Sequence, residues 1–406
     1  MKNNRLVVIP SDALDDYIKN GMSEDFIANY YNPNGFYKEV FVVSPLERGI
    51  RKRCGMTVIG STPMQLNRVI RKIKPDIIRG YDGFKCADWL STLRIKEVPI
   101  VCSVHDRRPE LIHQSLKYAD LVICMSNIVK EEVCKQVKGI DINKIVVMPN
   151  RIDLTLFQKK YDKEFTEKQR GNYQRKFHII HVGRKSEEKN IDTVIKTMKY
   201  LGDDYEVIFI GRGDSEVYKR LAYEENVADK CHFIESVPNS ELPYWYSWCD
   251  CMCTPSRCEG FGIVFLEAAA CETKIVTSDI APMNEYLTNN KSALLVKEYE
   301  NPEVLAEAIK KACTMPKDGN MGVEAREVAK TFSKYEIDKK ENEWMSSAIS
   351  YDKVNFNKEF WGIRMALYYE SKMMYNQIKR KLVRLKNGNF EKKIDTCDSS
   401  AYEKIN

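Results

Sequence analysis

Short runs of β-branched and apolar residues alternate with helix-like stretches along the chain, and this alternation constrains the fold more than any other feature. One helix is clear at 127–139, where Ser126 or Asn127 can cap the start and Gly139 the end. Apolar strands joined by helices form parallel sheets that are covered on both faces, so the first 150 residues predict a doubly wound α/β sheet. The runs lie at 5–9, 39–43, 76–78, 99–104, 120–124 and 145–148.

The same alternation restarts after a polar, charged segment at 157–176 that has no apolar periodicity. The length of 406 residues suits two domains of common size. Ligands of such sheets bind at the carboxyl ends of the strands, so two facing sheets form a cleft. The second set of runs lies at 178–182, 206–210, 232–234, 251–254, 274–277 and 293–296. The predicted domains are 1–172 and 173–335, followed by a helix at 336–350 that returns to the first domain and a helical tail at 351–406.

The composition, with 43% hydrophobic and 30% charged residues, is typical of a globular protein without a membrane span. The apolar run in the N-terminal sequence MKNNRLVVIP is too short for a signal peptide, so we expect a first strand and a cytoplasmic protein. The net charge of +6 is modest and does not favour nucleic-acid binding. Most of it lies in the tail, where twelve Lys and Arg face seven Asp and Glu.

Thirteen cysteines, an odd number in a chain expected in the cytoplasm, favour reduced thiols over a disulfide framework. Cys249, Cys251 and Cys253 alternate, which predicts that all three point to one face of a strand. Zinc ligands usually have two to four residues between them and a second pair nearby. Small buried hydrophobic side chains are therefore the favoured interpretation over a metal site.

The segment PSRCEGFGIVFLEAAAC, residues 255–271, follows a predicted strand and joins a glycine-containing turn to the start of a helix. Free N–H groups and the helix dipole at such a start form a site for an anion such as a diphosphate. Glu259 lies in the loop and Glu267 in the helix, about one nucleotide-sugar diphosphate length apart. Two glutamates at this spacing are usually surface charge, but the flanking strand, glycines and helix favour a ligand site.

This segment resembles the E-x7-E signature of the retaining glycosyltransferases of family 4, whose GT-B fold has two Rossmann-like domains facing across a cleft. The resemblance covers roughly residues 1–350. It implies that Glu259 contacts the donor hexose, that the backbone of Gly260, Phe261 and Gly262 contacts the donor, and that Glu267 binds the ribose. Glu272 stands where the family usually has glycine, which leaves the end of the helix less certain than the chemistry.

A second matching segment is HVGRKSEEKN, residues 181–190, where Arg184 follows a predicted strand and Lys189 lies on the next loop. Two cations at that place can neutralise a diphosphate leaving group. Taken alone, the pattern is typical of a solvated loop. The resemblance implies the diphosphate role for Arg184 and Lys189.

IGRGD, residues 210–214, matches the G-x-G loop of the family and adds Gly211 and Gly213 to the donor site. By itself it is only a turn. The third glycine and the ribose-binding acid of the dinucleotide fingerprint are missing, which argues against a dinucleotide oxidoreductase.

The first domain offers fewer signals. His105 follows a predicted strand in VCSVHD; a lone histidine is usually structural, but the family commonly has one beside the reacting sugar, so the resemblance makes His105 a candidate catalytic residue with Glu259. The segment 148–157, MPNRIDLTLF, resembles the family's hinge sequence, with Arg151 in place of glycine. The loop after the first strand has only Gly21 where the family often has paired glycines, so the acceptor side is poorly constrained.

The expected function is transfer of a sugar, with retention, from a UDP- or GDP-linked donor to a hydroxyl of a carbohydrate or lipid-linked acceptor in polysaccharide or glycoconjugate synthesis. No Asp-x-Asp pair follows a strand, so we expect neither an essential metal nor another cofactor. A nucleotide-sugar epimerase of GT-B fold and a non-catalytic nucleotide-sugar-binding protein are the alternatives.

Basic residues alternate with aromatic and aliphatic ones at 360–390, at near-helical spacing. Such a helix can lie on an anionic membrane surface at the inner face of the membrane, or it can pack on the first domain or a partner. The sequence favours neither. The cluster RGIRKRCG, residues 48–55, is expected to be a solvated loop rather than part of a basic acceptor surface.

Overall fold

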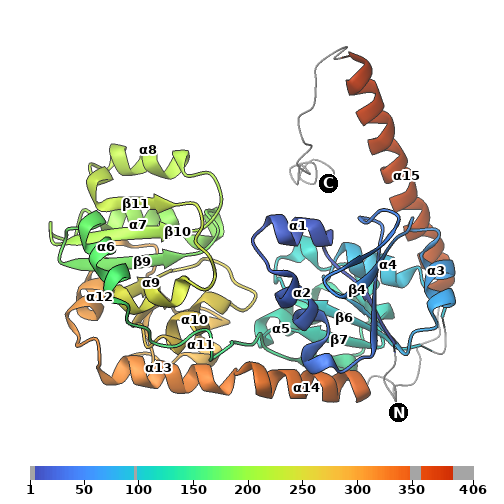
Figure 1. Cartoon of the computed structure of the whole chain (residues 1–406), viewed down its shortest axis with the longest axis horizontal. Helices are drawn as coiled ribbons and strands as arrows, with labels where there is room; N and C mark the ends of the chain where they lie inside the picture. Colours follow the sequence, from blue (N-terminus) through green and yellow to red (C-terminus); the bar gives the residue numbers. More distant parts are fainter. Residues whose placement is uncertain (1–4, 96–97, 348–357, 387–406) are drawn as a thin grey trace.

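A computed structural model places the chain in two lobes that lie side by side, each built around one sheet (Figure 1). It describes residues 5–95, 98–347 and 358–386. The strands are β1 (Arg5–Ile9), β2 (Glu39–Ser44), β3 (Ile50–Arg53), β4 (Met56–Gly60), β5 (Ile77–Gly80), β6 (Ile100–Val104), β7 (Leu121–Cys124), β8 (Ile145–Val147), β9 (Phe177–Val182), β10 (Tyr205–Ile210), β11 (Cys231–Ile234), β12 (Cys251–Cys253), β13 (Ile275–Ser278) and β14 (Leu294–Val296). The α-helices are α1 (Leu14–Lys19), α2 (Glu24–Tyr31), α3 (Leu66–Ile73), α4 (Lys85–Ser91), α5 (Asn127–Gln136), α6 (Lys163–Asn172), α7 (Ile191–Thr197), α8 (Glu216–Glu224), α9 (Leu242–Trp248), α10 (Ile263–Ala270), α11 (Met283–Tyr286), α12 (Pro302–Thr314), α13 (Asn320–Thr331), α14 (Lys334–Ser347) and α15 (Lys358–Lys386). Short 3-10 helices are η1 (Pro33–Gly35), η2 (Pro109–Leu111), η3 (Gln114–Tyr118), η4 (Ile142–Lys144), η5 (Glu187–Lys189) and η6 (Ala228–Lys230).

The first sheet has the order β3-β4-β2-β1-β5-β6-β7-β8 and is parallel except for β3. Strands β5, β6 and β7 are buried along their whole length, because helices cover both faces. Apolar side chains of α3, α4 and α5 pack on one face, and those of α1 and α2 pack on the other. The predicted doubly wound sheet is confirmed, with β3 and β4 as strands that the sequence pattern did not indicate.

The second sheet has the order β11-β10-β9-β12-β13-β14 and is parallel throughout its described strands. Helices α7, α8 and α12 pack on one face, and α9, α10 and α13 on the other. The change of direction in strand order lies between β9 and β12. The loops after these two strands therefore meet at the place where doubly wound sheets bind ligands.

The polar segment at the expected domain boundary contains a helix, α6, which the sequence did not predict because the segment has no apolar periodicity. Asp162 caps it, because its Oδ1 accepts a hydrogen bond of 2.7 Å from the Phe165 N–H. The Phe165 ring packs at 5.4 Å from that of Trp245 and at 5.7 Å from that of Tyr244. Helix α6 therefore packs on the second domain, although it precedes residue 173.

The two crossings between the domains lie side by side. The Ile152 N–H donates to the Phe332 carbonyl at 2.9 Å, and the Lys334 N–H donates to the Ile152 carbonyl at 2.8 Å. Beyond this bridge α14 runs along the first domain (Figure 1). Both crossings thus pass through one hinge.

Arg151, the residue in place of the family glycine, anchors α14 at this hinge. Its guanidinium contacts Glu341 and lies 2.9 Å from Asp338, both on α14. Arg79 on β5 contacts the same Glu341 carboxylate, and the side chains of Arg79 and Glu341 are 4% and 3% exposed. Burial opposes ionisation of Glu341, but the two arginines outweigh it and hold the pKa of this carboxyl below its usual range. The triad therefore joins the last helix of the two-domain unit to the first sheet.

Helix α15 packs its first turns on α4 and then projects away from the first domain (Figure 1). The Trp361 Nε1–H donates to Ser115 Oγ at 2.8 Å and the Tyr369 hydroxyl to Asp88 Oδ2 at 2.7 Å. Gly362 permits close approach, since a Cβ there would lie 2.7 Å from the Ser91 carbonyl oxygen. The remainder of the predicted tail, 351–357 and 387–406, lies outside the described residues.

Two local expectations are wrong. Residues 50–53 form the edge strand β3 rather than a loop, and Arg51 and Arg53 both pair with Asp15, so the cluster is largely neutralised. Cys249 ends α9 instead of lying in β12, and it packs on the opposite side of the sheet from Cys251 and Cys253. All three thiols are buried.

Candidate functional site

The loop between β12 and α10 carries the segment 255–271 to the carboxyl edge of the second sheet. The buried Ser256 hydroxyl donates to Glu259 Oε1 at 2.8 Å, and Ser278 Oγ donates to the Ser256 carbonyl at 2.6 Å. Gly262 precedes α10 at φ 81°, and a Cβ there would lie 2.6 Å from the Phe265 ring. Glycine is required at this turn, which holds the loop tightly against the helix start.

Gly260 is the point where this loop meets the first domain. A Cβ on Gly260 would lie 1.9 Å from the His105 carbonyl oxygen. Ser126 Oγ, from the cap of α5, donates to the Gly260 carbonyl at 2.6 Å. The structure therefore brings Gly260 and His105 together, as expected of residues on opposite sides of one cleft.

Glu259 and Lys189 form an ion pair at the base of this loop. Lys189 Nζ lies 2.5 Å from Glu259 Oε1, and both side chains are largely buried. The His181 Nε2 atom lies 3.1 Å from the Lys189 carbonyl oxygen. Burial lowers the pKa of His181 to about 4, so a neutral imidazole holds this turn. A cation and a carboxylate from two separate loops thus meet beside the start of α10.

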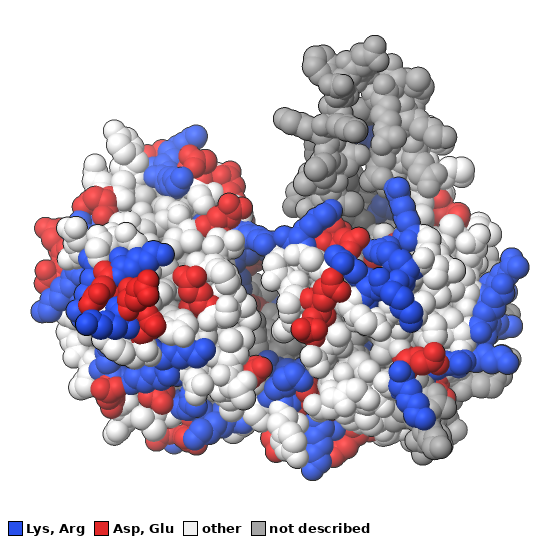
Figure 2. All heavy atoms as spheres, viewed as in Figure 1, with Lys and Arg blue, Asp and Glu red and all other residues white. Residues whose placement is uncertain are grey.

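Arg184, the second predicted cation, lies at the rim. Its side chain is exposed, and no hydrogen bond or ion pair joins it to another described residue. On the face drawn in Figure 2, Lys and Arg side chains gather along the junction between the lobes. Arg184 therefore does not join the Lys189–Glu259 pair in this structure.

Gly211 and Gly213 allow the loops after β9 and β10 to lie back to back. A Cβ on Gly211 would lie 1.8 Å from the Gly183 carbonyl oxygen, and one on Gly213 would lie 2.6 Å from the Lys185 carbonyl oxygen. Lys185 Nζ donates to the Gly211 carbonyl and, at 3.0 Å, to that of Ile234. Lys185 thus holds the G-x-G loop in place. The segment HVGRKSEEKN includes this lysine, but the motif does not indicate its role.

Phe261 belongs to the core of this region rather than to an open surface. Its side chain is 4% exposed, and its ring stacks on Tyr286 at 5.3 Å. The Tyr286 hydroxyl donates to the Phe261 carbonyl at 2.9 Å. The side chain of Phe261 thus supports the loop, and Tyr286, which no sequence motif indicated, holds it from the other side.

Glu267 lies within α10 with its carboxylate largely buried. The Tyr246 hydroxyl donates to Glu267 Oε2 at 3.0 Å. Burial raises the pKa of Glu267 to about 7, against the opposing effect of the Tyr246 hydrogen bond. Tyr246 was not among the predicted site residues, because its hydroxyl reaches Glu267 only through the packing of α9 on α10.

His105 follows β6 at the carboxyl edge of the first sheet. Its Nε2 is buried and has no hydrogen-bond partner among the described residues. Burial and the nearby Arg79 charge lower the pKa of His105 to about 4, so the imidazole is neutral. Its ring stacks on that of Tyr81 at 6.2 Å. An unpartnered neutral imidazole at the domain junction can donate or accept one hydrogen bond.

Further contacts cross the junction on both sides of Gly260. Glu285 on α11 accepts three hydrogen bonds of 3.0 to 3.1 Å from Asn127 and Ile128 at the start of α5. Arg108 lies 3.1 Å from Glu188, and Arg212 donates to Asn20 at 2.6 Å. The lobes are therefore closed on each other in this structure.

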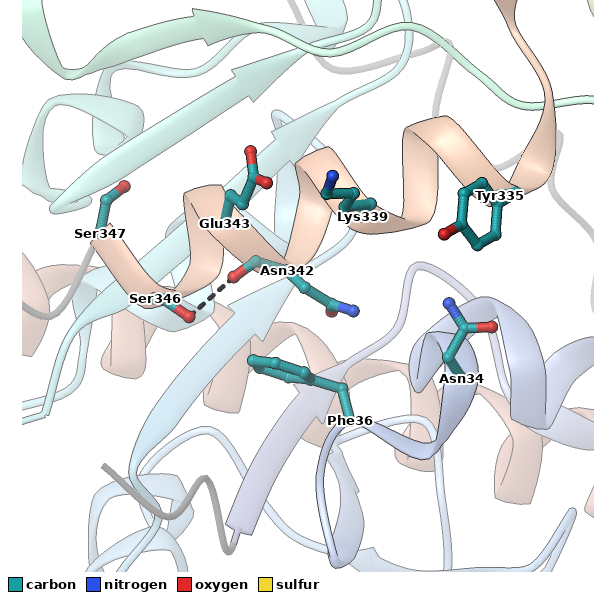
Figure 3. A pocket seen from close by; sticks show the side chains of 8 residues that line it. All are labelled: Asn34, Phe36, Tyr335, Lys339, Asn342, Glu343, Ser346 and Ser347. Atoms are coloured by element: carbon teal, nitrogen blue, oxygen red, sulfur yellow. Dashed lines mark hydrogen bonds between the residues drawn. The ribbon is translucent and has the colours of Figure 1, made fainter.

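A separate open cavity of about 730 Å³ lies between η1 and α14 (Figure 3). None of its lining residues belongs to the loops described above. They are Asn34, Phe36, Tyr335, Lys339, Asn342, Glu343, Ser346 and Ser347. The candidate site is thus defined by the converging loops at the junction and not by this cavity.

Two kinds of feature are absent from the described residues. In those parts of the chain, no group of three or more His, Cys, Asp and Glu could hold a metal ion. Within the same residues, no helix is both long and apolar enough to cross a membrane.

Comparison with known families gives two matches that together cover both domains. Residues 162–330 match the model described as "Glycosyl transferases group 1", and residues 17–156 match "Glycosyltransferase Family 4". The chain is 33% identical over 181 residues to the O-antigen chain mannosyltransferase RfbU of Salmonella typhimurium, covering 44% of this chain and 48% of that protein. The chain thus spans about half the length of this relative.

Two solved structures have the same two-domain GT-B fold. A glycosyltransferase from Rickettsia africae has a TM-score of 0.70 and 18% identity, covering 86% of this chain and all of that one. HepE from Anabaena, solved in complex with UDP, has a TM-score of 0.68 and 17% identity over 85% of this chain and all of that one.

Proposed function

Because the chain belongs to the family 4 glycosyltransferases with a group 1 domain, we propose that it transfers a sugar, with retention, from a nucleotide-diphosphate sugar to an acceptor hydroxyl. The observation that carries this proposal is the meeting of Lys189, Glu259 and the glycine turn before α10 at the domain junction. The donor is a UDP- or GDP-linked hexose. The mannosyltransferase relative acts on the O-antigen chain, which supports a role in cell-surface polysaccharide synthesis for this protein too.

The donor is held by the second domain. Backbone N–H groups at Gly260–Gly262 and the start of α10 face the diphosphate, and Lys189 and Arg184 neutralise it. The ribose hydroxyls donate to Glu267. The loop with Gly211 and Gly213 lies against the turn that carries these cations, which supports a place for it in the same donor site.

The Lys189–Glu259 ion pair has to open when the donor binds. In this structure the ammonium group of Lys189 is engaged by Glu259 Oε1. A bound diphosphate competes for this cation, which frees Glu259 to accept hydrogen bonds from the hexose. Binding therefore exchanges one internal ion pair for two contacts to the donor, one to the phosphate and one to the sugar.

The reaction breaks the bond between the anomeric carbon and the β-phosphate oxygen and forms a bond from that carbon to the acceptor oxygen on the same face. The leaving phosphate takes the acceptor proton. Lys189 and Arg184 stabilise the charge that develops on the phosphate, while Glu259 orients the hexose and His105 hydrogen-bonds to it from the first domain. Closure of the lobes excludes water and protects the donor from hydrolysis.

A thermal-shift series with UDP-, GDP- and ADP-sugars tests the donor assignment. We expect one class to raise the unfolding temperature of the wild-type chain, and Glu259→Ala and Glu267→Ala to reduce that shift. Glu303→Ala, an exposed change at the start of α12, is the control. The proposal fails if no sugar nucleotide stabilises the fold, or if the two site variants respond like the control.

Proton NMR of the donor during turnover separates the reaction types. A retaining transferase slowly hydrolyses its donor when acceptor is absent and releases the sugar first in the donor's own anomeric configuration. Interconversion of the nucleotide sugar without release of nucleotide indicates an epimerase. Tight binding with neither reaction, even after cell-wall glycan fractions are added, indicates a non-catalytic binding protein.

We also propose that α15 places the enzyme on an anionic membrane surface that carries a lipid-linked acceptor. Ile363, Leu367, Met374 and Ile378 are all 44% or more exposed, and at about 100° per residue they fall within an arc of about 60°. Arg364, Lys372 and Lys379 lie on one side of this stripe, which is typical of helices that lie in a membrane interface. On the packed side, Trp361 contacts η3 and Tyr369 contacts α4.

Vesicle sedimentation tests the membrane contact. We expect the chain to bind phosphatidylglycerol vesicles and to bind phosphatidylcholine vesicles much less. Changing Ile363, Leu367, Met374 and Ile378 to serine should abolish binding, while the same change at the exposed Val217 and Val323 should not. Equal sedimentation of the two variants would contradict this role for α15.

A further inference from the structure

Glu267 depends on a single side chain for its orientation. The residue as a whole is 9% exposed, and the hydrogen bond of 3.0 Å from the Tyr246 hydroxyl joins its carboxylate to α9. No ion pair joins Glu267 to a Lys or Arg of the described chain. Its Oε1 atom likewise has no hydrogen-bond partner among the residues described.

Tyr246 is held rigidly enough to fix the carboxylate. Its side chain is fully buried in the core between α9 and the second sheet. Thr273 Oγ1 donates to the Tyr246 carbonyl at 2.8 Å, which ties the same residue to the chain just beyond α10. Because α9 packs directly on α10, the Tyr246 hydroxyl cannot leave Glu267 without disturbing two helices.

The elements around α10 bring no other charge to Glu267. On α13, Arg326 bonds to the Ala270 carbonyl and lies 3.9 Å from Glu272, both beyond Glu267. Strand β13 has no ionisable side chain. On α9, Tyr244 faces Phe165 and Lys160 instead. Tyr246 is therefore the one polar group of these neighbouring elements that contacts this carboxylate.

We propose that Tyr246 is a positioning residue for donor binding: its hydroxyl engages Glu267 Oε2 and leaves Oε1 to accept the ribose hydroxyls. This inference rests on the proposed function, because it assumes that Glu267 binds the ribose. Tyr246 itself does not touch the donor. Its removal leaves a carboxylate that can rotate away and that ionises less readily.

The protonation state of Glu267 distinguishes a positioning role of Tyr246 from a simple loss of packing. An ionised carboxylate accepts hydrogen bonds from both ribose hydroxyls, whereas a protonated one offers less capacity. Burial raises the pKa of Glu267 to about 7, and the Tyr246 hydrogen bond acts against that rise. Donor affinity should thus fall as the pH drops through 7. Without the hydroxyl, this fall should begin at a higher pH.

The test compares Tyr246→Phe with Tyr244→Phe, the same change two residues away on the same helix. A ligand-free measurement comes first: ¹³C-carboxyl NMR of glutamate-labelled protein, with the Glu267 signal assigned by its loss in Glu267→Gln. We expect the titration midpoint of Glu267 to rise in Tyr246→Phe and to stay at the wild-type value in Tyr244→Phe. An unchanged midpoint in Tyr246→Phe overturns the proposal, whether or not any donor binds.

Calorimetric titration with UDP-glucose and GDP-mannose between pH 6 and 9 then tests the consequence. For the donor that binds wild type, we expect Tyr246→Phe to bind about tenfold more weakly at pH 7 and to recover most of that loss at pH 9. A loss that is equal at all pH values indicates a merely structural role and refutes the proposal. If Glu267→Gln binds the donor as well as wild type, the ribose assignment fails instead, and with it the donor half of the proposed function.

Discussion

Replacing Glu341 by glutamine should destabilise the first domain more than any exposed change of charge. The substitution leaves Arg79 buried without its carboxylate, while Arg151 keeps Asp338 at 2.9 Å. Arg79 keeps Ser103 Oγ at 3.1 Å and the neutral amide oxygen of the new glutamine as hydrogen-bond acceptors, but it has no negative charge beside it. Breaking a buried pair from one side costs about 3 to 5 kcal/mol, because one charge stays desolvated and unpaired.

Urea unfolding followed by tryptophan fluorescence measures this loss. With a typical urea slope, the expected change moves the midpoint by on the order of 1 to 2 M. The matched control is Glu307→Gln, which breaks the exposed pair with Lys310 on α12 and should cost less than about 0.5 kcal/mol.

A second variant separates burial of charge from loss of contact. Replacing Arg79, Arg151 and Glu341 together by Met, Leu and Leu removes all three charges, and buried triads replaced in this way are often as stable as before. We expect this variant to be more stable than Glu341→Gln. The reasoning is refuted if Glu341→Gln unfolds within about 1 kcal/mol of wild type, or if the apolar triple variant is the less stable of the two.

Three further outcomes follow from the contacts described. Stability of the second domain should fall at both ends of the pH range. Burial favours the neutral form of Glu206, but hydrogen bonds with His178 and His232 outweigh burial and hold the pKa of Glu206 at about 2. The contribution of ionised Glu206 to stability is therefore complete above about pH 4.3 and is lost as the pH falls toward 2. The pKa of His178 is raised by Asp250 and Glu206 in spite of burial, so the contribution of protonated His178 to stability is complete below about pH 6.5 and is lost above that. Urea midpoints measured against pH should show both losses of stability, and His178→Gln should remove the alkaline one. Gly260→Ala places a methyl carbon 1.9 Å from the His105 carbonyl oxygen, so the two lobes should close less well. We expect the transfer rate to fall at least tenfold with a smaller loss of donor affinity, and equal losses of rate and affinity would contradict a closure defect. Glu285→Gln weakens the charged cap on α5, and small-angle scattering should report a larger radius of gyration than in the control Glu298→Gln; identical radii would show that this contact does not hold the lobes together.

The sequence predicted the two sheets well, because each strand is a short apolar run set off by helices. It missed β3, where Arg51, Lys52 and Arg53 make an exposed edge look like a loop, and with it the short neighbouring strand β4. It also missed α6, because this helix has a polar surface, packs through the single ring of Phe165 and therefore shows no apolar periodicity. In both places the fold depends on tertiary partners that local sequence does not show.

The candidate site divides in the same way. Glycines with a required conformation or a close neighbour, such as Gly211, Gly260 and Gly262, stand in motifs that sequence alone can recognise. Tyr246 and Lys185 could not be assigned, because their partners lie in other elements and only packing brings them together. The predicted roles of the site residues remain predictions.

Lys189, beside Glu259 at the start of α10, is the cation that we expect to bind the donor diphosphate. Calorimetric titration of wild type, Lys189→Ala and the exposed control Lys219→Ala with UDP-glucose and GDP-mannose tests it directly. We predict that one donor binds wild type and the control equally and binds Lys189→Ala at least tenfold more weakly. Equal binding to all three proteins, or no binding of either donor to wild type, would contradict the claim.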